Sequence, residues 1–295
     1  MSFINLDLSN EEIIKKYFND LCCDDYTDPL IKGGQTYADN ALNSLDIQNY
    51  AKTRNNVLPI EKRGSTYLSP YIRHGLISLP EVWSFVEKFE YQDKTKFRDE
   101  LLWQEFSRHL YAIVGKNSRN YLNYSIKSKK NNQNNYQNMN CINSIKTELE
   151  STGYMVNQTR MWFASHFSLR DGNNWRNYED YMFKHLVDGS RFANRLGWQW
   201  VMGSQTGKIY GFSKFQVDKR AKSLCNTCVV KYDCPIQNWP EEVSITKKTV
   251  EFNLNPEINF GPKSVKNNID SKPEFVWLTA ESLGDNDPAL NYYSN

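Results

Sequence analysis

The sequence has little excess charge, no long apolar run and no secretory leader, and each absence excludes a class of protein. Its 36 lysines and arginines are nearly balanced by 34 aspartates and glutamates, so overall charge does not indicate a nucleic-acid-binding protein. A local basic surface would be needed for that role. No apolar stretch reaches the length of a membrane span, and the N-terminal MSFINLDLSNEEIIKKYF has no basic region before an apolar core. We therefore expect a cytoplasmic protein with no membrane association.

Cysteine is scarce, and its spacing is informative. In a cytoplasmic chain, six cysteines are more often free or bound to metal than paired in disulfides. Cys225, Cys228 and Cys234 form C-x2-C-x5-C followed by proline, a spacing with which thiolates can chelate one ion or cluster. We choose Cys141 as the fourth ligand. An iron–sulfur cluster of the 4Fe–4S type is the first interpretation, zinc the second and unligated cysteines the third, and the adjacent pair Cys22–Cys23 is expected to pack.

Two-residue alternation typical of strands is also absent, whereas helical periodicity dominates. Ser9 to Glu12 has the pattern of a capping box, and Gly33–Gly34 breaks the chain. A second helix is predicted from Ala38 onward, carrying the chain to Tyr50 and Arg54. Further helices are predicted at 69–74, 80–89, 97–114, 142–152, 156–169 and 178–187. The sequence therefore predicts an all-α fold.

Two polar stretches contain few apolar anchors. Residues 118–140 are rich in Asn and Lys and are predicted to form a solvated loop. Residues 245–295 are predicted to form an extended polar tail that wraps the body through its aromatic residues, Phe252, Phe260, Phe275 and Trp277. We divide the chain into a helical domain at 1–244, with a core at 33–215 and the cysteine cluster at 225–234, and the tail at 245–295.

Four sequence blocks carry the main functional signal. The stretch 188–203 reads DGSRFANRLGWQWVMG, and tryptophans so placed most often pack in a core. It is preceded by GSTYLSPYIRHGLIS at 64–78, ELLWQEFSRHL at 100–110 and STGYMVNQTRMWFASHF at 151–167. Together, and in this order, the blocks resemble the flavin-binding half of the DNA photolyase and cryptochrome family, from about Gly33 to Phe215. The resemblance implies a helical bundle like the photolyase FAD-binding domain.

Two of the blocks place polar and aromatic side chains on one face of a helix. The spacing i, i+3, i+4 occurs in each of them, and residues at this spacing are neighbours on a helix surface. The residues are Glu100, Trp103 and Gln104 in one block, and Asn157, Arg160 and Met161 in the other. We expect the two faces to meet over one cavity.

The hydroxyl residues before the predicted helix at 69–74 suit the phosphates of a dinucleotide, although alone they would be read as a helix cap. The resemblance implies a cofactor-binding turn at 65–69. It also implies contacts by a Tyr and an Arg ahead of that turn. The resulting set is Tyr50, Arg54, Ser65, Thr66, Leu68 and Ser69.

The resemblance further assigns residues around the flavin ring. It implies that Arg160 pairs with Asp188, and that Asn194 faces the N5 edge of the ring and favours a stabilised neutral radical. The remaining predicted cofactor contacts are Trp103, Gln104, Asn157 and Ser190. Gln104 and Gln158 stand where photolyases carry Arg, and Ser190 replaces an Asp. Losing these charges is expected to change the redox potential of the cofactor.

A substrate pocket and an electron relay are also implied by the resemblance. Enzymes acting on a damaged base take it out of the stack, so the pocket needs stacking surfaces and hydrogen-bonding groups. The implied catalytic residues are Glu100, Trp103, Asn157, Met161 and Trp200. The absence of histidine from 157–161 favours the cyclobutane dimer over the (6-4) lesion. Trp198 and Trp175 match the first two members of the relay, and its surface member is left open among Tyr121, Tyr124, Tyr181 and no tyrosine at all.

The family pattern begins near the first residue, which leaves no space for an antenna domain. We therefore expect a short, monomeric, light-driven photolyase-like lyase that uses FAD and acts on UV-damaged DNA, single strands included. Basic residues near the pocket, Arg160, Arg195, Lys208 and Lys214, suit phosphates but also suit a solvated face. A blue-light sensor of the cryptochrome type is the first alternative. A redox or DNA-binding protein that has lost FAD is the second.

Overall fold

Helices dominate the computed structural model, which describes residues 4–5, 7–22, 26, 29–128, 138–170, 175–238, 243–248, 275–287 and 290–291. The α-helices are α1 (Asn10–Tyr17), α2 (Gln35–Asn43), α3 (Tyr50–Thr53), α4 (Ser69–Arg73), α5 (Leu79–Phe85), α6 (Tyr91–Val114), α7 (Asn140–Thr152), α8 (Asn157–Ser165), α9 (Trp175–His185), α10 (Leu196–Val201) and α11 (Lys214–Asn226). Short 3-10 turns lie at Asn19–Leu21, Ile60–Lys62, Val86–Lys88 and Gly115–Arg119, and π-helical turns at His166–Arg170 and Arg191–Arg195. The prediction of an all-α fold is confirmed.

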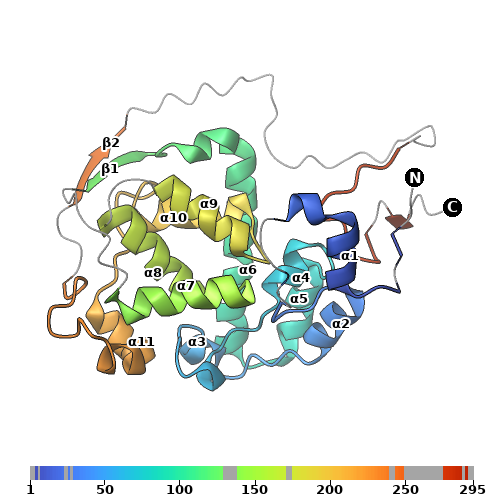
Figure 1. Ribbon diagram of the computed structural model, residues 1–295, viewed down its shortest axis with the longest axis horizontal. Coiled ribbons are helices and arrows are strands. Elements are labelled where there is room, and N and C mark those ends of the chain that lie inside the picture. The colour runs from blue at the N-terminus through green and yellow to red at the C-terminus, as the bar shows by residue number, and fades with distance from the viewer. Residues whose placement is uncertain are drawn as a thin grey trace.

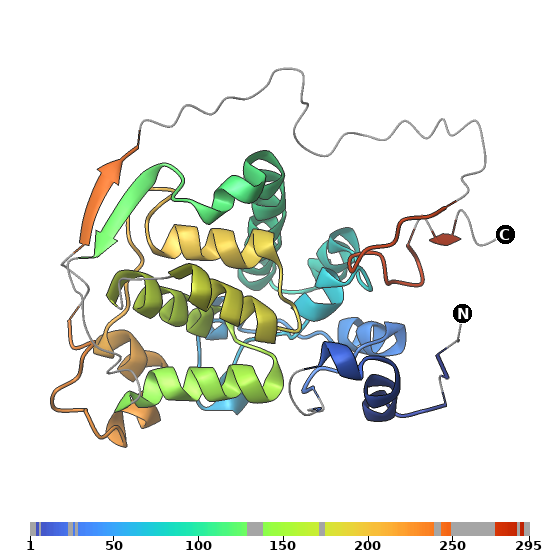
Figure 2. The ribbon, with the colours of Figure 1, turned by 45° about the horizontal axis from the view of Figure 1, so that its top comes forward.

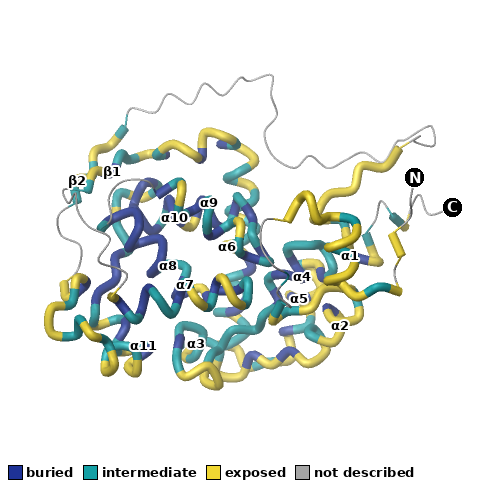
Figure 3. The backbone as a smooth tube through the Cα atoms, in the orientation of Figure 1, coloured by how far each residue is buried: buried dark blue, intermediate teal, exposed yellow. Residues whose placement is uncertain are grey.

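Two hydrophobic clusters form most of the core, one on each side of α6 (Figures 1 and 2). The larger is built from α7 to α11, and its centre is α8, where Trp162 and Phe163 are almost completely buried. The smaller is built from α2, α4, α5 and the first half of α6. Figure 3 shows the darkest, most buried tube along α8 and α10. The functional side chains of α6 and α8 therefore project from elements that are fixed by packing.

One predicted helix start is confirmed, and two other predicted helix boundaries differ from the structure. Ser9 accepts a hydrogen bond from the Glu12 amide and Glu12 bonds back to Ser9, so the predicted capping box is present. The predicted helix from Ala38 to Arg54 is wrong as a single element, because α2 ends at Asn43 and Asn49 takes a left-handed conformation before α3. Helix α6 begins six residues earlier than predicted, since its polar first turns are held by ion pairs that apolar periodicity does not reveal, such as Lys94 with Glu87 at 2.6 Å.

The small antiparallel sheet was not predicted. Strand β1 (Tyr124–Ser128) pairs with β2 (Val243–Lys247), with Ile126 opposite Ile245. β1 lies inside the predicted solvated loop, and β2 spans the predicted start of the tail. Each strand is only five residues long, and its partner lies more than a hundred residues away in sequence, so no local turn signal marks the pair. Helix α11 was also missed.

A C-terminal strap, residues 275–287, crosses the end of α4 (Figure 2). The Leu283 amide donates to the His74 carbonyl at 3.2 Å, and Arg73 pairs with Glu281 at 2.9 Å. Phe275 and Trp277 are each 88% exposed, so the prediction that these aromatic residues anchor the tail is wrong. Phe252 and Phe260 lie outside the described residues. Within the described part of the chain, no helix combines the length and apolar content needed to cross a bilayer.

Candidate functional site

Two cavities adjoin between α6 and α8. The larger is about 430 Å³ and the smaller about 220 Å³, and Arg54, Glu100, Asn157 and Arg160 line both of them. The helix faces predicted from spacing do meet here, because both sets of residues line these walls. A ligand with two chemically distinct ends can extend from one cavity into the other. This shape suits a dinucleotide whose ring and phosphates need different surroundings.

The smaller cavity is lined by hydroxyl groups of the turn before α4. All the residues predicted at the turn and ahead of it lie in its wall, together with Gln104 and Asp188. Gly64 lets this turn approach α3, because a Cβ there would lie 2.5 Å from Thr53 Oγ1 and 2.7 Å from the Arg54 amide. Ser65 Oγ shares a 2.9 Å hydrogen bond with the hydroxyl of Tyr154, a lining residue that the sequence did not reveal. Hydroxyls and amides at this turn suit phosphate oxygens.

An ion pair closes the junction of the two cavities. Arg160 Nη2 contacts both carboxylate oxygens of Asp188, and its Nε donates to the Met155 carbonyl at 2.8 Å. The side chain of Asp188 is 3% exposed. The pairing implied by the resemblance is therefore present. In the wall of the smaller cavity, burial and the Glu100 carboxylate raise the pKa of Tyr50 well above its ordinary value.

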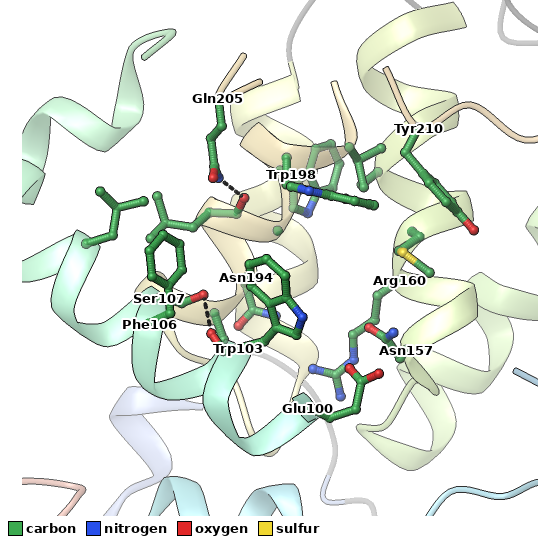
Figure 4. A pocket seen from close by; sticks show the side chains of 18 of the residues that line it. Glu100, Trp103, Phe106, Ser107, Asn157, Arg160, Asn194, Trp198, Gln205 and Tyr210 are labelled. Atoms are coloured by element: carbon green, nitrogen blue, oxygen red, sulfur yellow. Dashed lines mark hydrogen bonds between the residues drawn. The ribbon is translucent and has the colours of Figure 1, made fainter. Parts of the chain in front are cut away.

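Asn194 projects into the larger cavity from the π-helical turn Arg191–Arg195 (Figure 4). Its Oδ1 accepts a 2.6 Å hydrogen bond from the Ser190 amide, which leaves its Nδ2 donor for a ligand. Ser190 caps this turn by accepting from the Ala193 amide at 3.2 Å. Ser190 lines neither cavity. Its predicted cofactor contact stays a prediction, and the structure gives it a capping role.

Aromatic rings form the mouth of the larger cavity. Trp103 is 56% exposed and meets Phe106 edge-on, with centroids 5.8 Å apart (Figure 4). Trp200 lies against Tyr210 with centroids 5.1 Å apart. Met161 also lines this cavity. Flat rings at an open mouth suit the stacking of a nucleobase.

Glu100 lies between cations at the junction of the cavities. Its carboxylate accepts from Arg54 Nη1 at 2.8 Å, and Lys96 Nζ lies 3.7 Å away. This arrangement places a charged acceptor beside the ring-lined mouth. Two of the predicted phosphate-binding cations are engaged elsewhere, because Arg195 Nε donates to Glu179 and Lys214 Nζ donates to the Lys231 carbonyl.

Several lining residues were missed from the sequence, chiefly Phe106, Leu110, Tyr154, Gln205 and Tyr210. Phe106 and Leu110 extend the helical spacing from Trp103, so that pattern could have revealed them. Tyr210 follows an irregular stretch and carries no such signal. Its hydroxyl accepts a long, 3.5 Å hydrogen bond from Gln158, which is buried and lines neither cavity.

Residues 97–227 match the family model described as the FAD binding domain of DNA photolyase. This part of the chain belongs to the DNA photolyase and cryptochrome family. Deoxyribodipyrimidine photo-lyase of Vibrio cholerae is 28% identical over 169 residues, which cover 52% of this chain and 35% of that protein. Cryptochrome DASH of Ostreococcus tauri is 27% identical over 225 residues, covering 68% of this chain and 39% of that protein. The chain thus spans little more than a third of these relatives.

Solved structures of the family confirm the photolyase-like fold. The crystal structure of a bacterial class III photolyase from Agrobacterium tumefaciens superimposes with a TM-score of 0.55 at 22% identity, covering 65% of this chain and 44% of that one. The family match begins in α6 and so includes Glu100, Trp103, Arg160 and Asn194, whereas the hydroxyl turn at 64–69 precedes it.

Two predicted relay tryptophans lie in line behind the larger cavity of this photolyase domain. Trp198 lines the cavity and is 1% exposed. Trp175, at the start of α9, is also buried, and its ring centroid lies 6.4 Å from that of Trp198. The structure therefore brings together the two side chains that the resemblance proposed as neighbours.

The four predicted metal-binding cysteines converge on one small cavity of about 20 Å³. Cys141 comes from α7, Cys225 from α11, and Cys228 and Cys234 from the segment that follows. Burial raises the pKa of Cys141 to about 12, with the neighbouring thiols acting in the same direction. Among the described residues, no three His, Cys, Asp or Glu side chains stand close enough to hold a metal as placed. The donor set fits a thiolate-bound metal in chemistry but not in its present spacing.

The other cysteine prediction concerned the pair at the end of the first helical region. Cys22 is exposed and does not pack, which corrects that prediction. Cys23 lies outside the described residues.

Proposed function

We propose that this chain is a FAD-dependent, light-driven repair protein that splits cyclobutane pyrimidine dimers in UV-damaged DNA, single strands included. The observation that carries the proposal is the continuity of the two cavities. The ring-lined larger cavity, which Asn194 also lines, shares the wall formed by Arg160 with the smaller cavity that Asp188 lines. A substrate at the mouth would therefore lie beside a flavin bound further inside. The similarity to deoxyribodipyrimidine photo-lyases supports the same chemistry.

The residues present fit FAD. The hydroxyls of Ser65, Thr66 and Ser69 would hold its phosphates, and Asn194 Nδ2 would donate to its ring. A reduced flavin bound here would supply one electron to the dimer on excitation by light and take it back after the ring opens. The buried Arg160–Asp188 ion pair would lie beside the cofactor. Its charges are already fixed in position, so they would not need to reorient when the charge on the cofactor changes.

The mouth would bind the flipped-out dimer. Trp103 and Trp200 would stack against its bases, since stacking on aromatic rings contributes about 1–3 kcal/mol per base. Glu100 would accept a hydrogen bond from a base edge. Arg54 and Lys96 would hold the Glu100 carboxylate in place, so binding would not require it to reorient. Met161 would pack beside the dimer and exclude water.

A blue-light sensor is the second candidate, and the C-terminal strap favours it. Arg73 Nε donates to the Gly189 carbonyl at 2.9 Å while Arg73 Nη1 donates to the Glu281 carboxylate. One side chain thus links the strap to the loop that carries Asp188. In a sensor, a change at the flavin would be transmitted through this loop to a partner protein, with no repair.

We also propose that the four cysteines hold a 4Fe–4S cluster, with zinc as the alternative. Their convergence from two helices and the following segment supports this. Arg170 lies beside them, and burial lowers its pKa to about 10 while the thiols Cys234 and Cys141 act in the opposite direction. A cation at this position would stabilise bound thiolates.

The decisive experiment for repair uses the protein purified in the dark. Its absorbance is recorded, and loss of thymine dimers from irradiated oligonucleotides is then measured under blue light. We expect a flavin spectrum and dimer loss in the wild type, and loss of repair with an unchanged spectrum in Trp200→Ala. Trp83→Ala, on the outer face of α5, is the matched control and should repair normally. Flavin bleaching without dimer loss in the wild type would support the sensor instead.

A further inference from the structure

We propose that Tyr121 is the terminal electron donor to the flavin cavity, through the relay Trp198–Trp175–Tyr121. The inference rests on the proposed flavin-dependent function. It names the residue at which the electron vacancy left by oxidation, the hole, reaches the surface. Tryptophan and tyrosine are the side chains most easily oxidised by one electron. The three rings form a continuous series from the cavity wall outward.

The ring geometry selects Tyr121 among the nearby tyrosines. Its centroid lies 6.4 Å from that of Trp175 with an interplanar angle of 35°, which repeats the 6.4 Å and 30° between Trp175 and Trp198. Trp198 is buried in the cavity wall, Trp175 is buried behind it, and Tyr121 is only partly buried. The two ring contacts are therefore similar, and Tyr121 is the least buried of the three residues.

The two other candidates are less well placed. The Tyr181 ring contacts Phe163, which in turn contacts Trp198, with centroid distances of 6.4 and 6.0 Å, and a phenylalanine between two rings is not readily oxidised. The ring of Tyr124 lies against Gly207, where an added Cβ would be 2.9 Å from its Cζ. Within the described part of the chain, no ring contact joins Tyr124 to Trp175.

A fixed cation favours movement of the hole from Trp175 to Tyr121. The Arg176 guanidinium lies 4.9 Å from the centre of the Trp175 ring and donates through Nε to the Arg119 carbonyl at 2.5 Å. A positive charge at this distance destabilises a tryptophan cation radical. Oxidised Tyr121 avoids that repulsion, because the phenol releases its proton and becomes a neutral radical.

One electron and one proton leave Tyr121 each time the relay operates. With FAD bound and excited by light, Trp198 would give one electron to the cofactor, Trp175 would give one to Trp198, and Tyr121 would give one to Trp175. Tyr121 releases its phenolic proton to water at the same stage. The net result would be one electron passed to the bound cofactor, a neutral Tyr121 radical and one solvated proton. A thiol reductant in solution then returns a hydrogen atom to Tyr121.

The test uses the FAD-loaded full chain, with ring-deuterated tyrosine, in electron paramagnetic resonance under blue light. We expect a tyrosyl signal in the wild type that narrows on deuteration. It should be lost in Tyr121→Phe, together with a severalfold fall in the rate of flavin photoreduction. The matched controls Tyr124→Phe and Tyr181→Phe should keep both. Tyr121→Trp should restore photoreduction and replace the tyrosyl signal by a tryptophanyl one.

A tyrosyl signal and photoreduction rate that survive in Tyr121→Phe would overturn the inference. Chemical reduction with dithionite separates the inference from the repair proposal, because it bypasses the relay. Reduced Tyr121→Phe should split dimers as the wild type does, and a defect there would also overturn the inference, since Tyr121 would then act on fold or substrate. If the reduced wild type splits no dimers, the repair proposal fails, while the radical measurement still decides the role of Tyr121.

Discussion

Arg160 Nη2 lies 3.0 and 2.8 Å from the two carboxylate oxygens of Asp188, and this pair joins α8 to the loop before α10. Because the carboxylate is almost completely buried, removing its charge leaves a guanidinium with no matching anion. The pair therefore has two separable effects, one on folding and one on the cofactor.

Asp188→Ala is expected to lower the free energy of unfolding by about 3 kcal/mol, the usual cost of breaking a buried pair, and to weaken FAD binding. Urea unfolding of the flavin-free protein and titration with FAD measure the two effects. Glu11→Gln is the matched control, since it breaks the exposed Lys15–Glu11 pair and should cost no more than about 1 kcal/mol. Equal losses in both variants would contradict the burial argument.

Gly64→Ala should disturb the hydroxyl turn. The new methyl group would meet Thr53 Oγ1 and the Arg54 amide, so the turn or α3 must shift, at a cost of about 1–3 kcal/mol. FAD affinity, measured by fluorescence titration, should fall with it. Gly33→Ala is the control, because a Cβ there has no neighbour within 4 Å. Unchanged affinity in Gly64→Ala would show that the turn does not contact the cofactor.

His166 should make stability depend on pH. Burial, aided by the Arg170 charge, lowers its pKa to about 3, so the unfolded chain binds the proton more readily than the folded one. Its contribution is complete above the unfolded pKa near 6.5 and is lost as pH falls from there toward 3, about 2 kcal/mol by pH 5.

Urea midpoints between pH 7.5 and 5 test the His166 prediction. His166→Gln should flatten the dependence, whereas the exposed His109→Gln should leave it unchanged. A wild-type midpoint that does not move over this range would show that His166 titrates normally.

Cys141→Ser should abolish metal binding if the four thiols share one cluster or ion. Iron, sulfide and zinc analysis of the purified protein measures this and also distinguishes the two metals. Cys22→Ser is the control, because Cys22 is exposed and lies far in sequence from the four candidate ligands. Metal that survives in Cys141→Ser would remove Cys141 from the ligand set.

Helical spacing predicts which faces of α6 and α8 meet, because side chains three and four residues apart share a face whatever surrounds them. The same spacing rule predicts that Phe106 lines the cavity. It does not predict this for Tyr210, whose position depends on an irregular stretch after α10. Ser190 shows a different limit. A family pattern marks its position as polar, but only the structure shows its hydroxyl bonded to the Ala193 amide.

The β1–β2 pair and α11 could not be predicted from the sequence for another reason. Ile126 and Ile245 are opposite each other only after the chain has folded, so neither segment carries enough information alone. Helix α11 buries few residues, among them Val217 and Ala221, and its backbone is kinked at Ala221, which weakens its apolar periodicity.

The strap at 275–287 meets the body mainly through backbone atoms. The Glu281 carbonyl oxygen lies 2.1 Å from the place a Cβ on Gly75 would occupy, and the Gly75 carbonyl oxygen lies 2.2 Å from the corresponding place on Gly284. At this crossing the two backbones lie so close that neither position 75 nor position 284 has room for a Cβ. The fit there depends on the two glycines and not on the side chains of the neighbouring strap residues. Evolution or an engineer can therefore rewrite most of the strap without loosening it, whereas a single methyl group at either glycine would force it out.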